Sequence, residues 1–427
     1  MPVTINPDIN PDAPLTPQQA RNARRSVEFV RSVIATRDRD DNYKPYRPAE
    51  TWRPERLRLT PWAQFVERVL RSPAAADGVS APELELIGKL RLFTGVFTGK
   101  GLIEDIALDE FFAARGPLKE SNEALMRRAT TRGADLARFK GWYEALLPRD
   151  YLVPTPNVLG ELGVMRHGVI CNHQTADYFE RICLMYESGV LPFLRHERPS
   201  PTVLEIGGGY GFLAFLLWSI IRPARYFIVD IPESLLFSSI YLSAALPEEN
   251  IILVDDDATF DGQAAGIYFI PNFLWHRISA RVRDVDLAIN TLSFHEMPRS
   301  AVEEYADGIA AIVGRQQRPG LLFEQNFENA DERLGCNAKR ILRSRFRSEV
   351  IAPVYTFQTR GFAELHALDD SVLRAVRRLR PPVPWKLKLR SRVCGAYWSH
   401  AWIWRGLRLR VSDRRQLLRE TLARKAG

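Results

Sequence analysis

The chain has 427 residues, of which 46% are hydrophobic and 26% are charged, so it can bury substantial cores and is not a disordered protein. Its length exceeds the size at which a single hydrophobic core usually stops growing, which predicts about two or three domains. The formal net charge of +8 is uneven, because Lys and Arg far outnumber the two acids, Asp413 and Glu420, from residue 371 to the C-terminus.

Cysteine usage and hydropathy indicate the compartment. The four cysteines are scattered without a close pair, which argues against a disulfide framework or a zinc knuckle and fits a reducing cytoplasm. No basic stretch followed by an apolar run opens the sequence. The longest largely apolar run, Phe212 to Ile221, is far shorter than the roughly 20 residues that cross a bilayer. We therefore expect a cytoplasmic protein.

Residues 1–150 are predicted to form a helical N-terminal domain. One helix is expected at "TPQQARNARRSVEFVRSVIA", where Thr16 can act as the N-cap and Pro17 can occupy the first turn. Apolar residues then recur at helical spacing in "PWAQFVERVLRS", "APELELIGKLRLFTGVF" and "LARFKGWYEALL". A lead-in segment over residues 151–200 follows, with a turn-rich entry and a helix that begins near Thr175.

Residues 201–370 show a different period, in which short β-rich runs alternate with helical stretches. The expected strands are "TVLEI", "RYFIVD", "NIILVD", "VDLAIN" and "GLLFEQ", and "VYTFQT" and "FAELHAL" can add closing strands. These runs lack polar alternation, as strands do when helices cover both of their faces. The pattern predicts an α/β domain with a doubly wound, mostly parallel, Rossmann-like sheet.

A glycine-rich turn follows the first of these strands, in "VLEIGGGYGFLAFLLW". Its glycines let the backbone turn tightly into a helix whose first N–H groups can face an anion; they are Gly207, Gly208, Gly209 and Gly211. The stretch "GYGFLA" satisfies the dinucleotide pattern G-x-G-x-x-A, and Asp230 at the end of the next strand could bind a ribose. On these residues alone, a dinucleotide remains a candidate ligand.

Glu205 distinguishes a dinucleotide from a positively charged cofactor. It lies two residues before Gly207, where its carboxylate would repel a pyrophosphate but attract a ligand that carries an ammonium and a sulfonium. The stretch resembles motif I of the class I S-adenosylmethionine-dependent methyltransferases, E/D-x-G-x-G-x-G, which Glu205, Gly207, Gly209 and Gly211 match. The resemblance implies an open α/β sheet and S-adenosylmethionine as the cofactor.

Further cofactor residues follow from the same resemblance. Asp230 matches the acid that binds the ribose hydroxyls, although it could instead cap the next helix. Asp255 and Asp256 follow the expected third strand, where the family often has an acid that contacts adenine; a solvated acidic turn is the alternative. The stretch "VDLAINTLSFHEMP" resembles motif IV, and Asn290 in it is a candidate cofactor contact.

Two stretches narrow the resemblance to a family of bacterial sugar O-methyltransferases. They are "GELG...HGVICNHQTADYFERI...ESGVL", upstream of motif I, and "NTLSFHEM"; the likeness covers about residues 157–347. It implies that the lead-in segment packs over the cofactor, which makes Asn172 and Tyr178 candidate substrate contacts. Asn172 could equally shape a turn, and Tyr178 could equally fill a core.

Methyl transfer to a sugar hydroxyl requires a base that takes the hydroxyl proton. His295 lies just past the fourth strand, and an ordinary imidazole titrates near neutral pH, so His295 is the candidate base, with a capping or core role as the alternative. Glu296 could orient its imidazole or bind the sugar, and Glu324, at the end of strand five, is a candidate substrate contact or helix cap. No ligand spacing demands a metal, so none is predicted.

The basic C-terminal extension, residues 371–427, interleaves Arg and Lys with tryptophans. This composition suits the headgroups of an anionic membrane, which favours peripheral contact with the inner membrane face and a lipid-linked acceptor. Docking of the extension on the acidic remainder of the chain is the alternative. No nucleic-acid recognition motif is present, and nucleic acid is not expected as a partner.

These observations together predict an S-adenosylmethionine-dependent O-methyltransferase. Its acceptor would be a sugar hydroxyl in surface polysaccharide, glycolipid or nucleotide-sugar biosynthesis. A nicotinamide-dependent enzyme that acts on nucleotide sugars is one alternative, and a catalytically silent methyltransferase-like binding subunit is another. Neither the particular sugar nor the oligomeric state is predicted.

Overall fold

The computed structural model describes residues 14–48, 61–70, 78–93, 141, 143–161, 164–258, 260–315, 318–326, 336–351, 363–387 and 389. The predicted closing strand at "VYTFQT" and most of the basic C-terminal extension lie outside the described residues. In the described part of the chain, no helix is long and apolar enough to cross a membrane.

The first helix begins where the sequence predicts. α1 (Pro17–Arg39) has Thr16 as its N-cap, and the Thr16 side chain accepts a hydrogen bond from the backbone of Gln19. The Gln19 side chain accepts one from the Thr16 backbone in return, so a complete capping box fixes the start of the helix. A 3₁₀ turn, η1 (Asp41–Tyr46), and the helices α3 (Pro61–Leu70), α4 (Ala81–Gly88) and α5 (Leu90–Phe93) follow.

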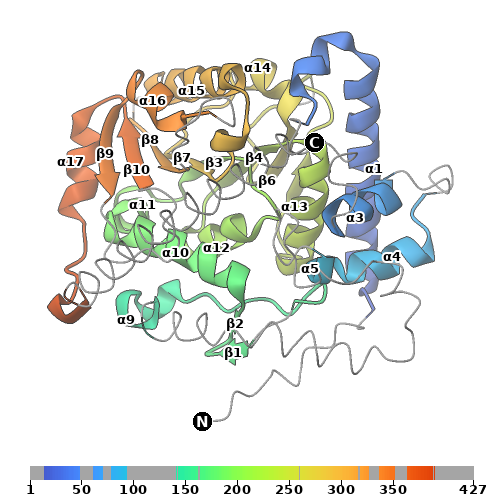
Figure 1. Ribbon diagram of the computed structural model, residues 1–427, viewed down its shortest axis with the longest axis horizontal. Helices are drawn as coiled ribbons and strands as arrows, with labels where there is room; N and C mark the ends of the chain where they lie inside the picture. The colour runs from blue at the N-terminus through green and yellow to red at the C-terminus, as the bar shows by residue number, and fades with distance from the viewer. Residues whose placement is uncertain are drawn as a thin grey trace, which may run out of the picture.

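The N-terminal helices pack against the sheet domain. α1 lies along α13 (Pro232–Ala245) (Figure 1), and Arg37 of α1 donates two hydrogen bonds of 2.9 and 3.0 Å to Glu233 of α13. The Phe65 ring of α3 lies 5.2 Å from the Phe237 ring of α13. Buried residues from α1 to the last described helix form one hydrophobic cluster. The packing therefore continues across residue 150, and the division into domains stays a prediction.

The lead-in segment contains short elements and two helices. They are α9 (Glu144–Leu146), η5 (Arg149–Tyr151), the antiparallel pair β1 (Val164–Arg166) and β2 (Val169–Cys171), α10 (His173–Glu187) and α11 (Val190–Glu197). The helix predicted to begin near Thr175 starts two residues earlier, because Asn172 is its N-cap and accepts a hydrogen bond from the Thr175 backbone.

Eight strands form one sheet in the order β5-β6-β4-β3-β7-β8-β10-β9. The strands are β3 (Thr202–Ile206), β4 (Arg225–Asp230), β5 (Ile251–Leu253), β6 (Gly266–Pro271), β7 (Leu287–Thr291), β8 (Leu321–Gln325), β9 (Arg347–Ile351) and β10 (Ala363–Ala367). β10 runs antiparallel to both of its neighbours, and the other pairs are parallel. The predicted mostly parallel α/β sheet is confirmed, with "FAELHAL" supplying β10.

One strand of the sheet was not predicted. β6 lies between β4 and β5, so "NIILVD" forms a short edge strand and does not pair with β4. Every residue of β6 is buried. Its signal is a short apolar run, "GIYFIP", whose period does not distinguish a strand from a buried helix.

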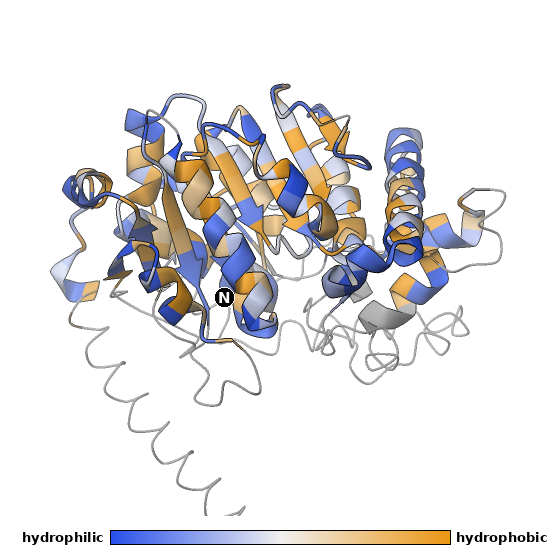
Figure 2. Ribbon diagram, turned by 90° about the horizontal axis from the view of Figure 1, so that it is seen from above, coloured by the Kyte–Doolittle hydropathy of each residue, from blue (hydrophilic) through white to orange (hydrophobic). Residues whose placement is uncertain are grey.

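The remaining helices cover both faces of the sheet. They are α12 (Phe212–Ile221), α13, α14 (Trp275–Ile278), α15 (Arg299–Gly314), α16 (Ala338–Arg343) and α17 (Asp370–Arg378), with 3₁₀ turns η6 (Asn272–Leu274) and η7 (Phe294–Glu296). In Figure 1, α15 and α16 lie on one side of the sheet and α10 and α12 on the other. Figure 2 shows that the strands between these layers are mostly hydrophobic. The carboxyl ends of β3, β4, β7 and β8 meet at one edge, where open α/β sheets bind their ligands.

Candidate functional site

The glycine turn after β3 has a backbone that only glycine adopts without strain. Gly207, Gly209 and Gly211 have φ values of +79°, +58° and +94°. A Cβ atom at Gly207 would lie 2.2 Å from the Oγ atom of Ser293, which follows β7. The turn therefore needs glycine both for its conformation and because the loop after β7 approaches it closely.

Glu205, the predicted contact of the cofactor ammonium, lies near the carboxyl end of β3. Its side chain is buried, and one carboxylate oxygen accepts a hydrogen bond of 2.9 Å from the Tyr226 hydroxyl of β4. Burial raises the pKa of Glu205 from 4.5 to about 7, because it disfavours the charged form. Among the described residues, no cation forms an ion pair with this carboxylate. A cationic ligand would supply that missing charge.

Asp230, the predicted ribose contact, closes the glycine turn from β4. One of its carboxylate oxygens accepts a hydrogen bond of 3.1 Å from the Gly209 backbone, and the other accepts one of 2.8 Å from Ile231. Burial raises the pKa of Asp230 to about 7 as well, partly opposed by these backbone hydrogen bonds. The N-cap of α13 is Ile231, whose side chain forms no capping bond, so Asp230 is placed by the turn.

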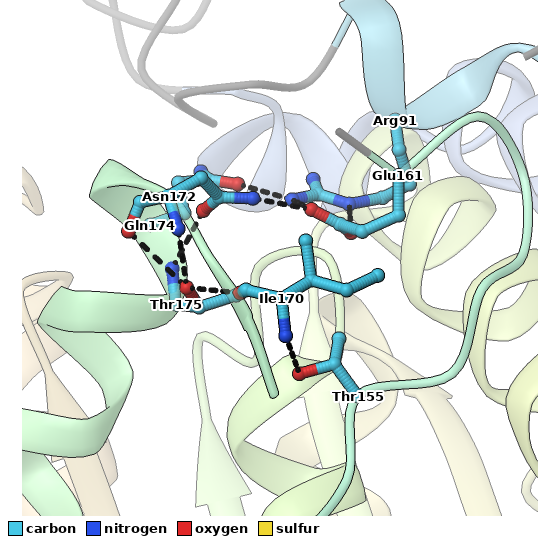
Figure 3. Close-up of polar contacts among 7 residues, drawn as sticks. All are labelled: Arg91, Thr155, Glu161, Ile170, Asn172, Gln174 and Thr175. Carbon is cyan, nitrogen blue, oxygen red and sulfur yellow. Dashed lines mark hydrogen bonds and ion pairs between the residues drawn. The ribbon is translucent and has the colours of Figure 1, made fainter. Parts of the chain in front are cut away.

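A buried polar cluster joins α5 to the lead-in segment, as Figure 3 shows for Arg91, Glu161, Asn172 and Gln174. The Arg91 side chain of α5 donates hydrogen bonds of 2.5 and 3.2 Å to Glu161 and one of 2.8 Å to Gln174. Its guanidinium lies 3.8 Å from the centre of the Tyr210 ring, which belongs to the glycine turn. Asn172 donates a hydrogen bond of 2.6 Å to Glu161. The cluster fixes the position of Tyr210.

The two candidate substrate residues of the lead-in segment have different surroundings. The Asn172 amide caps α10 and binds Glu161, so both of its ends are used within the protein. The Tyr178 ring is half-buried and packs edge-on against Tyr210 and Phe212, with 5.5 Å between ring centres in each case. Tyr178 therefore lies beside the glycine turn, and a substrate contact of either residue stays a prediction.

A hydrogen-bonded set of amides joins the ends of β7 and β8. The Asn290 side chain donates a hydrogen bond of 2.8 Å to the Ile206 carbonyl and accepts one of 2.8 Å from the Asn326 side chain. Asn326 also donates a hydrogen bond of 2.8 Å to the buried carboxylate of Glu324, at the end of β8. Asn290 and Glu324 therefore hold the strand ends together, and their contacts with cofactor and substrate stay predictions.

The Asn326 amide also determines which nitrogen of His295 carries a proton. Its nitrogen donates to Asn290 and Glu324, so its Oδ1 must act as an acceptor. This oxygen lies 3.2 Å from His295 Nδ1, which must therefore carry the proton in the neutral ring. The unprotonated nitrogen is Nε2, which lies 3.7 Å from a carboxylate oxygen of Glu296. A carboxylate at this distance would stabilise the imidazolium that forms when Nε2 takes a proton.

Leu292, which links β7 to this base, has a φ of +56°. A branched side chain in the left-handed region is strained, and such strain is concentrated at functional sites. The turn brings Ser293 back toward β3, where its Oγ lies 2.5 Å from the Asn290 amide. Sequence reasoning missed Ser293, whose only signal is that it precedes the conspicuous pair His295 and Glu296.

Asp255 and Asp256, the predicted adenine contacts, lie farther out than expected. They follow the edge strand β5, are exposed, and are separated from β4 by the unpredicted strand β6. Asp257 beside them pairs with Arg277 at 3.0 Å. This position favours the solvated acidic turn over an adenine contact, which stays untested. Within the described residues, no group of His, Cys, Asp and Glu could hold a metal ion.

No family model matches the chain, and no curated protein matches it. Among solved structures, it is similar to precorrin-6y C5,15-methyltransferase from Geobacter metallireducens, with 13% identity and a TM-score of 0.28 over 42% of this chain and 85% of that chain. An O-methyltransferase family protein from Burkholderia thailandensis has 12% identity and a TM-score of 0.29 over 46% and 60%. The S-adenosylmethionine-dependent methyltransferase SibL has 13% identity and a TM-score of 0.30 over 62% and 73%.

The fold is assigned from the sheet itself. Seven of the eight described strands run in the same direction, and β3 with its glycine turn lies near their centre. The eighth strand, β10, is antiparallel and lies between β8 and β9. Helices cover both faces of this sheet (Figure 1). The chain has the doubly wound, mostly parallel α/β fold that its sequence predicts.

Proposed function

We propose that the chain is an S-adenosylmethionine-dependent O-methyltransferase whose acceptor is a sugar hydroxyl. The observation that carries the proposal is Glu205, a buried carboxylate beside the glycine turn that forms no ion pair with any cation in the described ranges. The pyrophosphate of a dinucleotide would add negative charge beside it, whereas the ammonium of S-adenosylmethionine would neutralise it.

The residues around the turn fit this cofactor. Gly207 and Gly211 hold the turn in a conformation that points its backbone N–H groups past the end of β3, where they can face a ligand. Asp230 is held at the end of β4 by the Gly209 backbone, in the position that suits an acceptor for ribose hydroxyls. When bound there, the cofactor would supply a methyl group on a positively charged sulfur, which is already activated for transfer.

The chain's own residues then have to orient the acceptor and remove its proton. His295 would take the hydroxyl proton on Nε2 as the oxygen forms its bond to the methyl carbon. Asn326 holds the opposite ring nitrogen, and Glu296 would stabilise the imidazolium that forms. The His295 side chain is 12% exposed, so most water is kept from the base.

A sugar acceptor is supported by the resemblance of the lead-in segment and of "NTLSFHEM" to sugar O-methyltransferases. We place the reaction in surface polysaccharide, glycolipid or nucleotide-sugar biosynthesis. The basic C-terminal extension would bring the enzyme to an anionic membrane surface, where a lipid-linked acceptor would lie. Trp385, near the start of the extension, is 68% exposed, as a headgroup contact requires.

The proposal is tested by methyl transfer to a panel of acceptors. The purified chain is incubated with S-adenosylmethionine carrying a labelled methyl group and with free sugars, nucleotide sugars and lipid-linked oligosaccharides. We expect label in one class of glycan, at an oxygen, and no label with the His295→Ala variant. Tight cofactor binding without transfer to any acceptor would instead support the silent binding subunit.

A further inference from the structure

Tyr210 anchors the glycine turn in the hydrophobic core. It lies between Gly209 and Gly211, which both have a positive φ, and its side chain is fully buried. The ring packs edge-on against Tyr178 of α10 and Tyr241 of α13, with 5.5 and 5.1 Å between ring centres. The Tyr210 hydroxyl is buried and forms no hydrogen bond within the described residues. The contacts of the ring therefore hold this side chain, and with it the backbone of the turn.

Arg91, from the N-terminal region, adds a contact of another kind to this ring. The centre of its guanidinium lies 3.8 Å from the centre of the Tyr210 ring, within the range of a cation–π interaction. The Arg91 side chain is buried, and such an interaction is stronger where water is excluded than at an exposed site.

Arg91 is itself held in one orientation. Glu161 accepts hydrogen bonds from the Nε and from one terminal nitrogen of Arg91, and Gln174 accepts another of 2.8 Å (Figure 3). Asn172 donates a hydrogen bond of 2.6 Å to Glu161. The Arg91 backbone N–H donates one of 2.8 Å to the Leu159 carbonyl. A guanidinium with these partners is fixed in place, so it can fix the ring that it contacts.

We propose that Arg91 is a positioning residue that holds the glycine turn in its ligand-binding conformation through Tyr210. The inference rests on the proposed function, because it takes the glycine turn as the cofactor site. It also gives a task to the N-terminal region, whose sequence patterns indicate helices but no chemistry. Without Arg91 the ring gains freedom, and ligand binding then has to restore the order that the free protein has lost.

The test measures affinity for S-adenosylhomocysteine by calorimetric titration of full-length variants. Arg91→Met removes the guanidinium, whereas Arg91→Lys keeps a cation beside Glu161 without the planar group. Tyr210→Leu removes the ring, and Tyr210→Phe keeps it. The titration reports the fraction of binding-competent protein separately from the affinity, so partial unfolding of a variant does not mimic weak binding.

Arg198→Met is the matched control. Arg198 also lies over an aromatic ring, that of Phe193 at 4.7 Å, and also pairs with an acid, Asp286 at 3.0 Å. Asp286 accepts a hydrogen bond from the Thr202 backbone, at the amino end of β3, whereas the glycine turn follows the carboxyl end. The control therefore loses contacts of the same kind at the opposite end of the strand.

We expect Arg91→Met and Tyr210→Leu each to weaken binding by roughly 3- to 30-fold, the range for residues that act on a ligand site through other side chains. Arg91→Lys should lose part of the affinity, because an ammonium does not stack on a ring as a guanidinium does. Tyr210→Phe and Arg198→Met should bind like the unmodified chain. Arg91→Met/Tyr210→Leu should bind no more weakly than Tyr210→Leu alone, because both changes break the same link.

Normal affinity in Arg91→Met would overturn the role of Arg91 and leave the methyltransferase proposal standing. Where Arg91→Met does not fold, normal affinity in Arg91→Lys together with Tyr210→Leu has the same meaning. Losses that add in the double variant, or an equal loss in Arg198→Met, would also overturn it, since Arg91 would then not act through Tyr210. Failure of the unmodified chain to bind S-adenosylhomocysteine would overturn both proposals.

Discussion

The buried polar groups at the carboxyl ends of the strands differ between two parts of the sheet. At the ends of β7 and β8, hydrogen bonds among Asn290, Asn326 and Glu324 hold the loops in place. At the ends of β3 and β4, the carboxyl groups of Glu205 and Asp230 form no ion pair with the residues that the structure describes, and burial raises both of their pKa values to about 7.

The difference separates positioning from binding. The amide network is formed before any ligand arrives, so it can hold the His295 ring in one orientation. Burying the carboxyl groups of Glu205 and Asp230 costs free energy in the free protein. A ligand that brings a cation or a hydroxyl donor to them removes part of that cost, and this strengthens its binding. Variants at the β7 and β8 ends should therefore affect turnover and stability, and variants at the β3 and β4 ends should affect binding.

The largest effect is expected for His295→Ala. Removal of the base should lower kcat by roughly 10²- to 10⁴-fold, the usual contribution of general base catalysis, and leave cofactor affinity unchanged. Steady-state kinetics and calorimetry on the same preparation provide the measurement, with His196→Ala, an exposed histidine of α11, as the control. A loss of cofactor affinity equal to the loss of kcat would contradict this division of roles.

Asn326→Leu should disrupt the amide network. The substitution leaves the buried Glu324 carboxylate without its hydrogen bond from Asn326, and the other oxygen of Glu324 already has no partner. We expect the free energy of unfolding to fall by about 1–3 kcal/mol, the range for a buried polar group left unsatisfied. Urea denaturation followed by circular dichroism measures it, and an unchanged midpoint would show that the network is not structural.

Glu205→Gln should act on binding. Loss of the negative charge should weaken S-adenosylhomocysteine by roughly 10- to 100-fold, the range of a hydrogen bond to a charged group. The variant should not destabilise the free protein, because a neutral amide is easier to bury than a carboxylate. Calorimetry and thermal unfolding are compared with Glu248→Gln, an exposed glutamate. A variant that binds normally would remove Glu205 from the cofactor site.

The pH dependence should have opposite signs for stability and binding. The Glu205 pKa rises from 4.5 to about 7, so between these values the folded protein holds a proton that the unfolded chain has released. The free energy of unfolding should therefore fall as pH rises toward 7, and then level off. Affinity for a ligand with an ammonium should rise over pH 6 to 7, by at most about tenfold per pH unit and per proton released, because the ligand favours the ionised carboxylate.

Both trends should become weaker in Glu205→Gln, and Asp230 should account for the part that remains. Thermal unfolding and calorimetry at matched pH values measure the two trends. Affinity that falls from pH 6 to 8 would contradict a cationic ligand at this carboxylate.

The sequence predicts most of the frame of the sheet. Buried strands without polar alternation give β3, β4, β7 and β8, and the Thr16 and Pro17 pair locates the start of α1. The sequence did not predict β6, because its apolar run shows neither helical nor strand periodicity and ends in a proline. Its insertion also moved Asp255 away from β4.

The candidate site is only partly local in sequence. Glu205 and the glycine turn are contiguous, so a motif reveals them. Arg91 and Tyr178 reach the glycine turn from α5 and α10, and Asn326, just after β8, meets His295. Such contacts depend on tertiary packing, and no spacing within a single sequence encodes them.

The most direct test of the central claim is calorimetric titration of the unmodified chain with S-adenosylmethionine, S-adenosylhomocysteine and NAD, beside the Glu205→Gln/Asp230→Asn double variant. We expect micromolar binding of the two adenosyl ligands, no binding of NAD, and loss of binding in the double variant. Binding of NAD, or of none of the three, would contradict the assignment of the glycine turn to S-adenosylmethionine.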